Sequence, residues 1–171
     1  MISLRQATPD DTDTVENIME DARGYLKSQG LPQWQGVHGP NRAELERDAQ
    51  LGYGYVLEID GEVQGYSALE PGPDDAFKNL RDGVWEGTTE KYVIIHRVMI
   101  AKGSRGKKMG TALLNVMTDE ARRLGYKDVR IDTHPGNAIM QRVITEAGFK
   151  KSGDIMMNMP HGERIAYQKL I

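Results

Sequence analysis

The chain has 171 residues, of which 39% are hydrophobic and 27% charged, which is enough for one globular domain with a buried core. It has no cysteine, which excludes a disulfide framework, a thiolate zinc site and a cysteine nucleophile, and the expected location is the cytoplasm. The formal charge of -3 has the wrong sign for a protein whose whole surface binds nucleic acid, so any basic site must be local. We expect no membrane span, signal peptide or transit peptide, since apolar runs are short.

The first half of the sequence predicts two helices and an antiparallel hairpin. Residues 2–7 alternate as a strand does, and Thr8-Pro9-Asp10-Asp11 is typical of the start of a helix that runs to about residue 27. A second, charged helix is predicted over residues 41–51. Two strand-like segments, 53–59 and 62–69, flank the turn dipeptide Asp60-Gly61. Residues 71–87 predict a surface excursion with a short helix near Phe77.

The second half of the sequence alternates strands with helices. Strands are predicted over residues 91–101 and 127–133, helices over residues 106–125 and 137–147, and closing strands over residues 149–157 and 164–170. A strand, helix and strand in this order predict parallel strands, whereas the hairpin in the first half is antiparallel. The sheet is therefore predicted to be mixed, in an α/β fold.

A basic, glycine-containing loop lies between the strand that ends near Ile100 and the helix that follows. The backbone amides of a helix's first turn have no partners within the helix, and together with the helix dipole they form an anion site. Four cations lie within seven residues: Lys102, Arg105, Lys107 and Lys108. Because the chain as a whole is acidic, this local charge predicts a small polyanionic ligand. A Walker A loop is excluded, since Gly106-Lys107 is followed by lysine, and no dinucleotide fingerprint is present.

This segment resembles the acyl-CoA loop of the GNAT superfamily of N-acetyltransferases. Arg105 and Gly110 match the ends of the family's motif, and Lys108 stands in place of its middle glycine. The resemblance continues to Asn137, which is followed eleven residues later by Gly148-Phe149. It implies one acetyltransferase domain over residues 1–171, with a mixed, mostly antiparallel sheet, splayed parallel central strands and about four flanking helices.

The resemblance also implies acetyl-CoA as cosubstrate and no metal. The cofactor-binding residues that it implies fall in three groups: Val98, Met99 and Ile100 for the pantetheine amides; Arg105, Gly106, Lys107, Lys108, Met109, Gly110 and Thr111 for the diphosphate; and Asn137 for the pantetheine arm. A backbone amide in the first group would polarise the thioester carbonyl, and an amine would attack it directly.

An attacking amine must be neutral, so a base has to remove a proton from it. Asp132 is the first candidate, because it ends a parallel strand, where open α/β sheets bind ligands. The alternative for Asp132 is a helix cap or a salt bridge to Arg130 or Arg97. His96, predicted to face the same side as Val98, is the second candidate and would relay a proton through water.

The sequence gives fewer signals for the general acid, the acceptor site and the oligomeric state. The position of the family's general-acid tyrosine is Ile144 here, which leaves Tyr66, Tyr92 or no protein acid, and His134 is predicted to be a turn residue. Trp34 and Gln33 are predicted to bind the acceptor, a small-molecule or peptide amine, although Trp34 could instead cap the first helix. A homodimer is possible. The alternatives are a catalytically silent acyl-CoA sensor and, more weakly, a nucleic-acid binder, which the acidic total disfavours.

Overall fold

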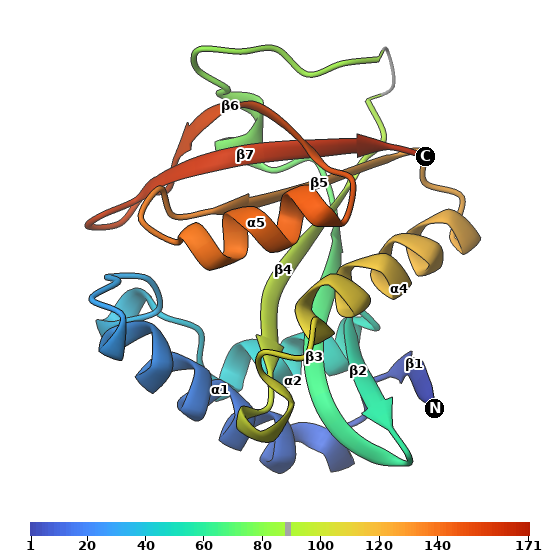
Figure 1. The fold of residues 1–171 in the computed structure, drawn as a ribbon. Helices are drawn as coiled ribbons and strands as arrows, with labels where there is room; N and C mark the ends of the chain where they lie inside the picture. Colours follow the sequence, from blue (N-terminus) through green and yellow to red (C-terminus); the bar gives the residue numbers. More distant parts are fainter. Residues whose placement is uncertain (88–89) are drawn as a thin grey trace.

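The computed structural model describes residues 1–87 and 90–171 and has a seven-stranded sheet of order β1-β2-β3-β4-β5-β7-β6 with helices on both faces (Figure 1). The strands are β1 Ile2–Gln6, β2 Gly54–Ile59, β3 Glu62–Pro71, β4 Val93–Ile100, β5 Asp128–Thr133, β6 Lys150–Met156 and β7 Glu163–Leu170. The α-helices are α1 Thr12–Ser28, α2 Arg42–Leu51, α3 Asp75–Lys78, α4 Met109–Arg123 and α5 Ala138–Glu146. Neighbouring strands are antiparallel except β4 and β5. The predicted mixed, mostly antiparallel sheet is confirmed.

Alternation along the strands divides the core between the two faces of the sheet. On β2, Val56 packs with apolar residues of α1, whereas its neighbours Tyr55 and Leu57 pack with α4. A third cluster lies under α3, around Phe77 and Ile155. Helices α1 and α2 therefore cover one face of the sheet, and α4 and α5 cover the other (Figure 1).

Local sequence signals set the boundaries of several elements. Asp60 and Gly61 both have positive φ, as a tight hairpin turn requires, and they join β2 to β3 as predicted. Asn41 caps α2, since its side-chain oxygen accepts from the Glu44 amide at 3.0 Å, and Gly52 ends the helix in the left-handed conformation. The predicted short helix near Phe77 is α3.

The helix predicted from residue 106 begins later, at Met109. Gly106 and Lys108 have φ of 77° and 58°, in the left-handed region that an α-helix cannot include. Residues Lys102–Ser104 form a short 3-10 helix before them, so the basic segment is a loop that turns into α4. Lys108 adopts a conformation that favours glycine, which keeps the turn despite the lysine side chain.

The two parallel strands separate soon after they meet. Only Val93 with Val129 and Ile94 with Arg130 are paired between β4 and β5. Beyond this point β4 continues to Ile100 along β3, while β5 continues along β7, and the two strands diverge (Figure 1). Among the described residues, the edge of β4 that faces β5 therefore has no strand partner over its second half.

A β-bulge in β4 lies where the strands diverge. Between the pairs Tyr66–Met99 and Ala68–His96, β4 has one residue more than β3, and Arg97 has a φ of 54°. The bulge changes the alternation of side chains, so Val98 packs toward α4 whereas Arg97 reaches α2. The prediction that Val98 faces the same side as His96 is therefore wrong, because it assumed an unbroken strand.

Candidate active site

A cavity of about 910 Å³ opens where β4 and β5 separate. Its walls come from β4, the loop before α4, the ends of β5, the start of α5 and the loop after α1. Of the residues proposed from sequence, the wall includes Gln33, Trp34, His96, Val98, Met99, Ile100, Arg105, Gly106, Lys108, Met109, Gly110, Thr111, Asp132 and Asn137. Lys107 is exposed and is not among the wall residues. Residues from segments more than 100 positions apart thus line one space.

The N-terminus of α4 opens on this cavity. The amide of Ala112 donates to the Lys108 carbonyl at 3.1 Å, so the amides of Met109, Gly110 and Thr111 precede the helix's own ladder of hydrogen bonds. A Cβ at Gly110 would lie 3.2 Å from a methyl group of Val143 on α5. The glycine therefore lets α4 and α5 approach closely at the mouth of the anion site.

Arg105 adds a side chain to the same end of the cavity. Its guanidinium carbon lies 4.6 Å from the centre of the Tyr25 ring on α1. Its Nη2 atom is buried and has no hydrogen-bond partner within residues 1–87 and 90–171. Buried charged donors are ordinarily paired, so this nitrogen indicates a place for an anionic or carbonyl oxygen.

Asn137 and the loop after α1 are joined across the cavity. The Asn137 side-chain oxygen accepts from the Met140 amide at 3.0 Å and caps α5, and its Nδ2 donates to the Gln33 side chain at 3.0 Å. Trp34 packs against the cluster beneath α1 and also lines the cavity, so both sequence-based interpretations describe its position. The carbonyl of Trp34 accepts from the Arg23 guanidinium on α1, which fixes the loop to that helix.

Asp132 lies at the end of β5 with its side chain 12% exposed. Its ion-pair partner is Arg164 on β7, with Nε 3.7 Å from Oδ2, and not Arg130 or Arg97. Burial, together with repulsion from Asp74, raises the pKa of the Asp132 carboxyl to about 6, against the opposing effect of Arg164. A carboxylate with this pKa is largely ionised at neutral pH and takes up a proton more readily than an ordinary aspartate.

His96 stands close to charges of both signs. Its Nε2 is 3.9 Å from a Glu70 oxygen, and its side chain is 20% exposed. Burial, with a contribution from Arg97, lowers the pKa of His96 to about 4, so the imidazole is neutral at physiological pH. A neutral imidazole both donates and accepts, which suits a relay better than a base. His134 is a turn residue, as predicted, since its Nδ1 accepts from the Gly136 amide at 3.0 Å.

Sequence reasoning missed a buried polar cluster behind the β4 bulge. The Asp48 carboxylate on α2 is fully buried and accepts from Arg97 Nη2 at 2.7 Å, from Arg97 Nε at 2.9 Å and from the Tyr66 hydroxyl at 2.6 Å. Burial raises the pKa of Tyr66 above its usual range, and Asp48 adds to this. A residue pair 49 positions apart gives no local sequence signal.

Neither tyrosine considered as a proton donor lines the cavity. Tyr66 is committed to Asp48, and the Tyr92 hydroxyl accepts from the Asp74 amide at 2.9 Å while its ring lies under the Arg130 guanidinium. Both side chains are nearly fully buried in other clusters. The structure therefore places no general acid at either tyrosine.

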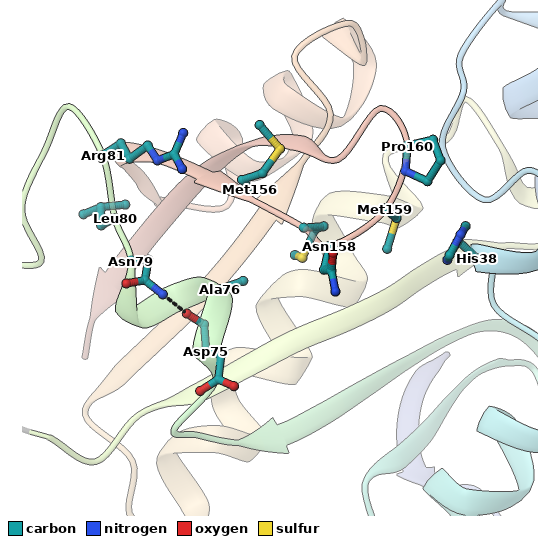
Figure 2. A pocket seen from close by; sticks show the side chains of 11 residues that line it. His38, Asp75, Ala76, Asn79, Leu80, Arg81, Met156, Asn158, Met159 and Pro160 are labelled. Carbon is teal, nitrogen blue, oxygen red and sulfur yellow. Dashed lines mark hydrogen bonds between the residues drawn. The ribbon is translucent and has the colours of Figure 1, made fainter.

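A second cavity, of about 980 Å³, adjoins the first. Figure 2 shows Ala76 of α3 and Asn79 just after it on one side, Asn158 and Met159 of the turn between β6 and β7 on another, and His38 at one end. His38, Met157 and Met159 line both cavities, so the two are neighbours with a shared wall. Within the described residues, no group of three or more His, Asp or Glu side chains is placed to hold a metal, and no helix combines the length and apolar character needed to cross a bilayer.

Residues 16–149 match the model of the acetyltransferase (GNAT) family. The chain belongs to this family. The "probable N-acetyltransferase camello" of Xenopus tropicalis is 26% identical over 108 residues. That alignment covers 63% of this chain and 43% of the relative, so the chain spans less than half the length of this curated relative.

Solved structures share the fold over nearly the whole chain. A GNAT-family acetyltransferase from Streptococcus agalactiae has a TM-score of 0.90 at 28% identity, covering 99% of this chain and 95% of that one. An aminoglycoside acetyltransferase, solved with coenzyme A and kanamycin, has a TM-score of 0.69 at 19% identity, covering 99% of this chain and 95% of that one. The splayed parallel strands of this chain thus belong to an acetyltransferase fold.

Proposed function

We propose that this chain is an N-acetyltransferase that moves an acetyl group from acetyl-CoA to a primary amine within one ternary complex. Residues 1–171 form the acetyltransferase domain, acting in the cytoplasm. The acceptor is a small-molecule or peptide amine. Its amino group lies near Asp132, and its body extends toward the second cavity, which shares His38 and Met159 with the first.

Different residues along the cavity bind the different parts of acetyl-CoA and accept the proton. The first amides of α4 and the unpaired Nη2 of Arg105 bind the diphosphate, and the unpaired edge of β4 binds the pantetheine amides as an added strand does. Acetyl-CoA supplies the acetyl group as a reactive thioester. A backbone amide of β4 near Val98 polarises the carbonyl, and Asp132 accepts the proton that the amine gives up.

The observation that supports the proposal most strongly is that an anion site and a basic carboxylate line the same cavity. The anion site is formed by the start of α4, and the carboxylate is Asp132, whose pKa is raised to about 6. A ligand that reaches from one to the other must pass along the unpaired edge of β4. The Arg105 nitrogen, buried and without a partner among the described residues, supports an oxygen-bearing ligand at the first end.

Release of free coenzyme A tests this function. With acetyl-CoA and a broad panel of amines, we expect thiol release that depends on the amine, and acetyl-CoA at about 100 times its Kd should stabilise the fold by roughly 2.7 kcal/mol. NADH and ATP should stabilise it far less. A catalytically silent acyl-CoA sensor would show the stabilisation without thiol release for any amine.

Gly110→Leu is expected to abolish the stabilisation by acetyl-CoA, because the new side chain would meet Val143 and crowd the first amides of α4. Gly103→Leu, in the loop before α4, is the matched control, since a Cβ there meets nothing within 4 Å. Thermal melting with and without acetyl-CoA measures both variants. Equal stabilisation of the two variants by acetyl-CoA would show that the start of α4 is not the binding site.

A further inference from the structure

Thr133 places a buried hydroxyl without a partner on the wall of the candidate active site. Its side chain is 1% exposed, and within residues 1–87 and 90–171 its Oγ1 has no hydrogen-bond partner. Other buried hydroxyls are satisfied: Thr118 donates to the Leu114 carbonyl at 2.8 Å and Ser104 to Gln64 at 2.7 Å. A buried hydroxyl without a partner is costly and indicates a missing ligand atom.

The position of Thr133 relates it to the reacting groups. It follows Asp132 at the end of β5, and successive strand residues point to opposite faces of a sheet. Asp132 pairs with Arg164 on one face of the sheet. Thr133 is paired with Ile165 of β7, and Ile165 packs into the cluster beneath α4 on the other face. The carboxylate and the hydroxyl thus flank the end of β5, beyond the point where β4 and β5 separate.

The other serine and threonine hydroxyls on this wall are already committed. Thr111 Oγ1 donates to Glu146 at 3.2 Å, and Ser104 donates to Gln64. The diphosphate is assigned to the start of α4, and the acceptor amine to the Asp132 side of β5. In a bound acyl-CoA the pantetheine amides and the thioester lie between these two ends. The amides are assigned to the edge of β4, which leaves the thioester for Thr133.

We propose that the Thr133 hydroxyl donates a hydrogen bond to the thioester sulfur and stabilises the thiolate as it departs. The inference rests on the proposed function. The amine nitrogen forms a bond to the carbonyl carbon, the carbon–sulfur bond breaks, and its electron pair leaves on sulfur. Asp132 takes the proton lost by the nitrogen. Thr133 keeps its own proton, and the thiolate is protonated from solvent.

The test compares coenzyme A with desulfo-coenzyme A, which lacks the sulfur, by calorimetric titration of the wild type and T133V. The wild type should bind coenzyme A at least about threefold more tightly than the desulfo compound, since a net hydrogen bond is worth this much or more. T133V should bind both equally, with its affinity for the desulfo compound within about twofold of wild type. T133S, which keeps the hydroxyl, should retain the preference.

Two further readouts separate this role from a structural one. T133V should melt at a higher temperature than the wild type, because valine removes a buried hydroxyl with no protein partner, whereas loss of a structural hydrogen bond would lower the melting temperature. Its kcat should fall about tenfold, less than for loss of an oxyanion-hole donor. T133A gives the same comparison of ligands if T133V does not fold.

The proposal is overturned if T133V keeps the wild-type preference for coenzyme A, or if the wild type shows no preference or binds neither compound. Failure of the proposed function looks different. A wild-type protein that prefers coenzyme A over the desulfo compound but transfers no acetyl group to any amine would remove the enzymatic role. The contact between Thr133 and sulfur would then still be established by the T133V titration.

Discussion

Asp132→Asn is expected to lower kcat by roughly 100- to 1,000-fold, because the amide cannot take the proton from the attacking amine. In the wild type, kcat/KM should rise with pH through about 6, where the Asp132 carboxylate forms. An aspartate with its ordinary pKa would place this rise near pH 3.8 instead. In the variant the rise near pH 6 should be absent. Measuring thiol release from pH 5 to 9 checks both expectations.

The control for this variant is Asp119→Asn, which removes an exposed carboxylate on α4 whose side chain is 71% exposed. It should leave the rate and the pH profile unchanged. Binding of acetyl-CoA should change little in Asp132→Asn, since the carboxylate lies away from the diphosphate site. A rise near pH 6 that persists in Asp132→Asn would assign the base to a group other than Asp132.

Asp48→Ala is expected to lower the free energy of unfolding by about 3–5 kcal/mol, the usual cost of breaking a buried ion pair by removing one partner. Arg97 would keep its charge in a largely buried position while losing its two hydrogen bonds to Asp48, and the Tyr66 hydroxyl would lose the Asp48 carboxylate that accepts from it. The Asp48–Arg97 ion pair connects α2 to the β4 bulge, and β4 lines the proposed acetyl-CoA site. The KM for acetyl-CoA should therefore also rise. Chemical denaturation and steady-state kinetics measure the two effects.

The double variant Asp48→Leu/Arg97→Met is the informative comparison. It removes both charges, and replacement of a buried pair by apolar side chains is often close to neutral, so much of the lost stability should return. The distorted bulge should keep the KM for acetyl-CoA high. A cost below about 1 kcal/mol for Asp48→Ala would mean that the pair contributes no more than an exposed one.

Turn, cap and stop residues that act over short distances explain which elements of the fold could be predicted from the sequence. The Asp60-Gly61 turn, the Asn41 cap and the Gly52 stop act over a few residues, and each element they bound was predicted. The start of α4 was placed too early, because Lys108 adopts a left-handed conformation that lysine seldom takes. The parallel pair followed from the order of strand, helix and strand, whereas its separation followed from the family resemblance.

The candidate site was predictable where residues are close in sequence. The segment around Arg105 and Gly110 is contiguous, and the structure places it on one cavity wall. The bulge is at Arg97, whose ion-pair partner Asp48 is far away in sequence, and no local signal marks it, so the direction of Val98 was predicted wrongly. The partner of Asp132 is Arg164, on a strand that no local rule pairs with it.

The central claim is that the start of α4 and Arg105 bind the diphosphate of acetyl-CoA. Calorimetric titration with acetyl-CoA and with acetyl-pantetheine, which lacks the diphosphate and nucleotide, tests it most directly. Several charge-assisted hydrogen bonds at about 1.5–3 kcal/mol each predict at least about 100-fold tighter binding of acetyl-CoA. Equal affinity for the two compounds would contradict the account.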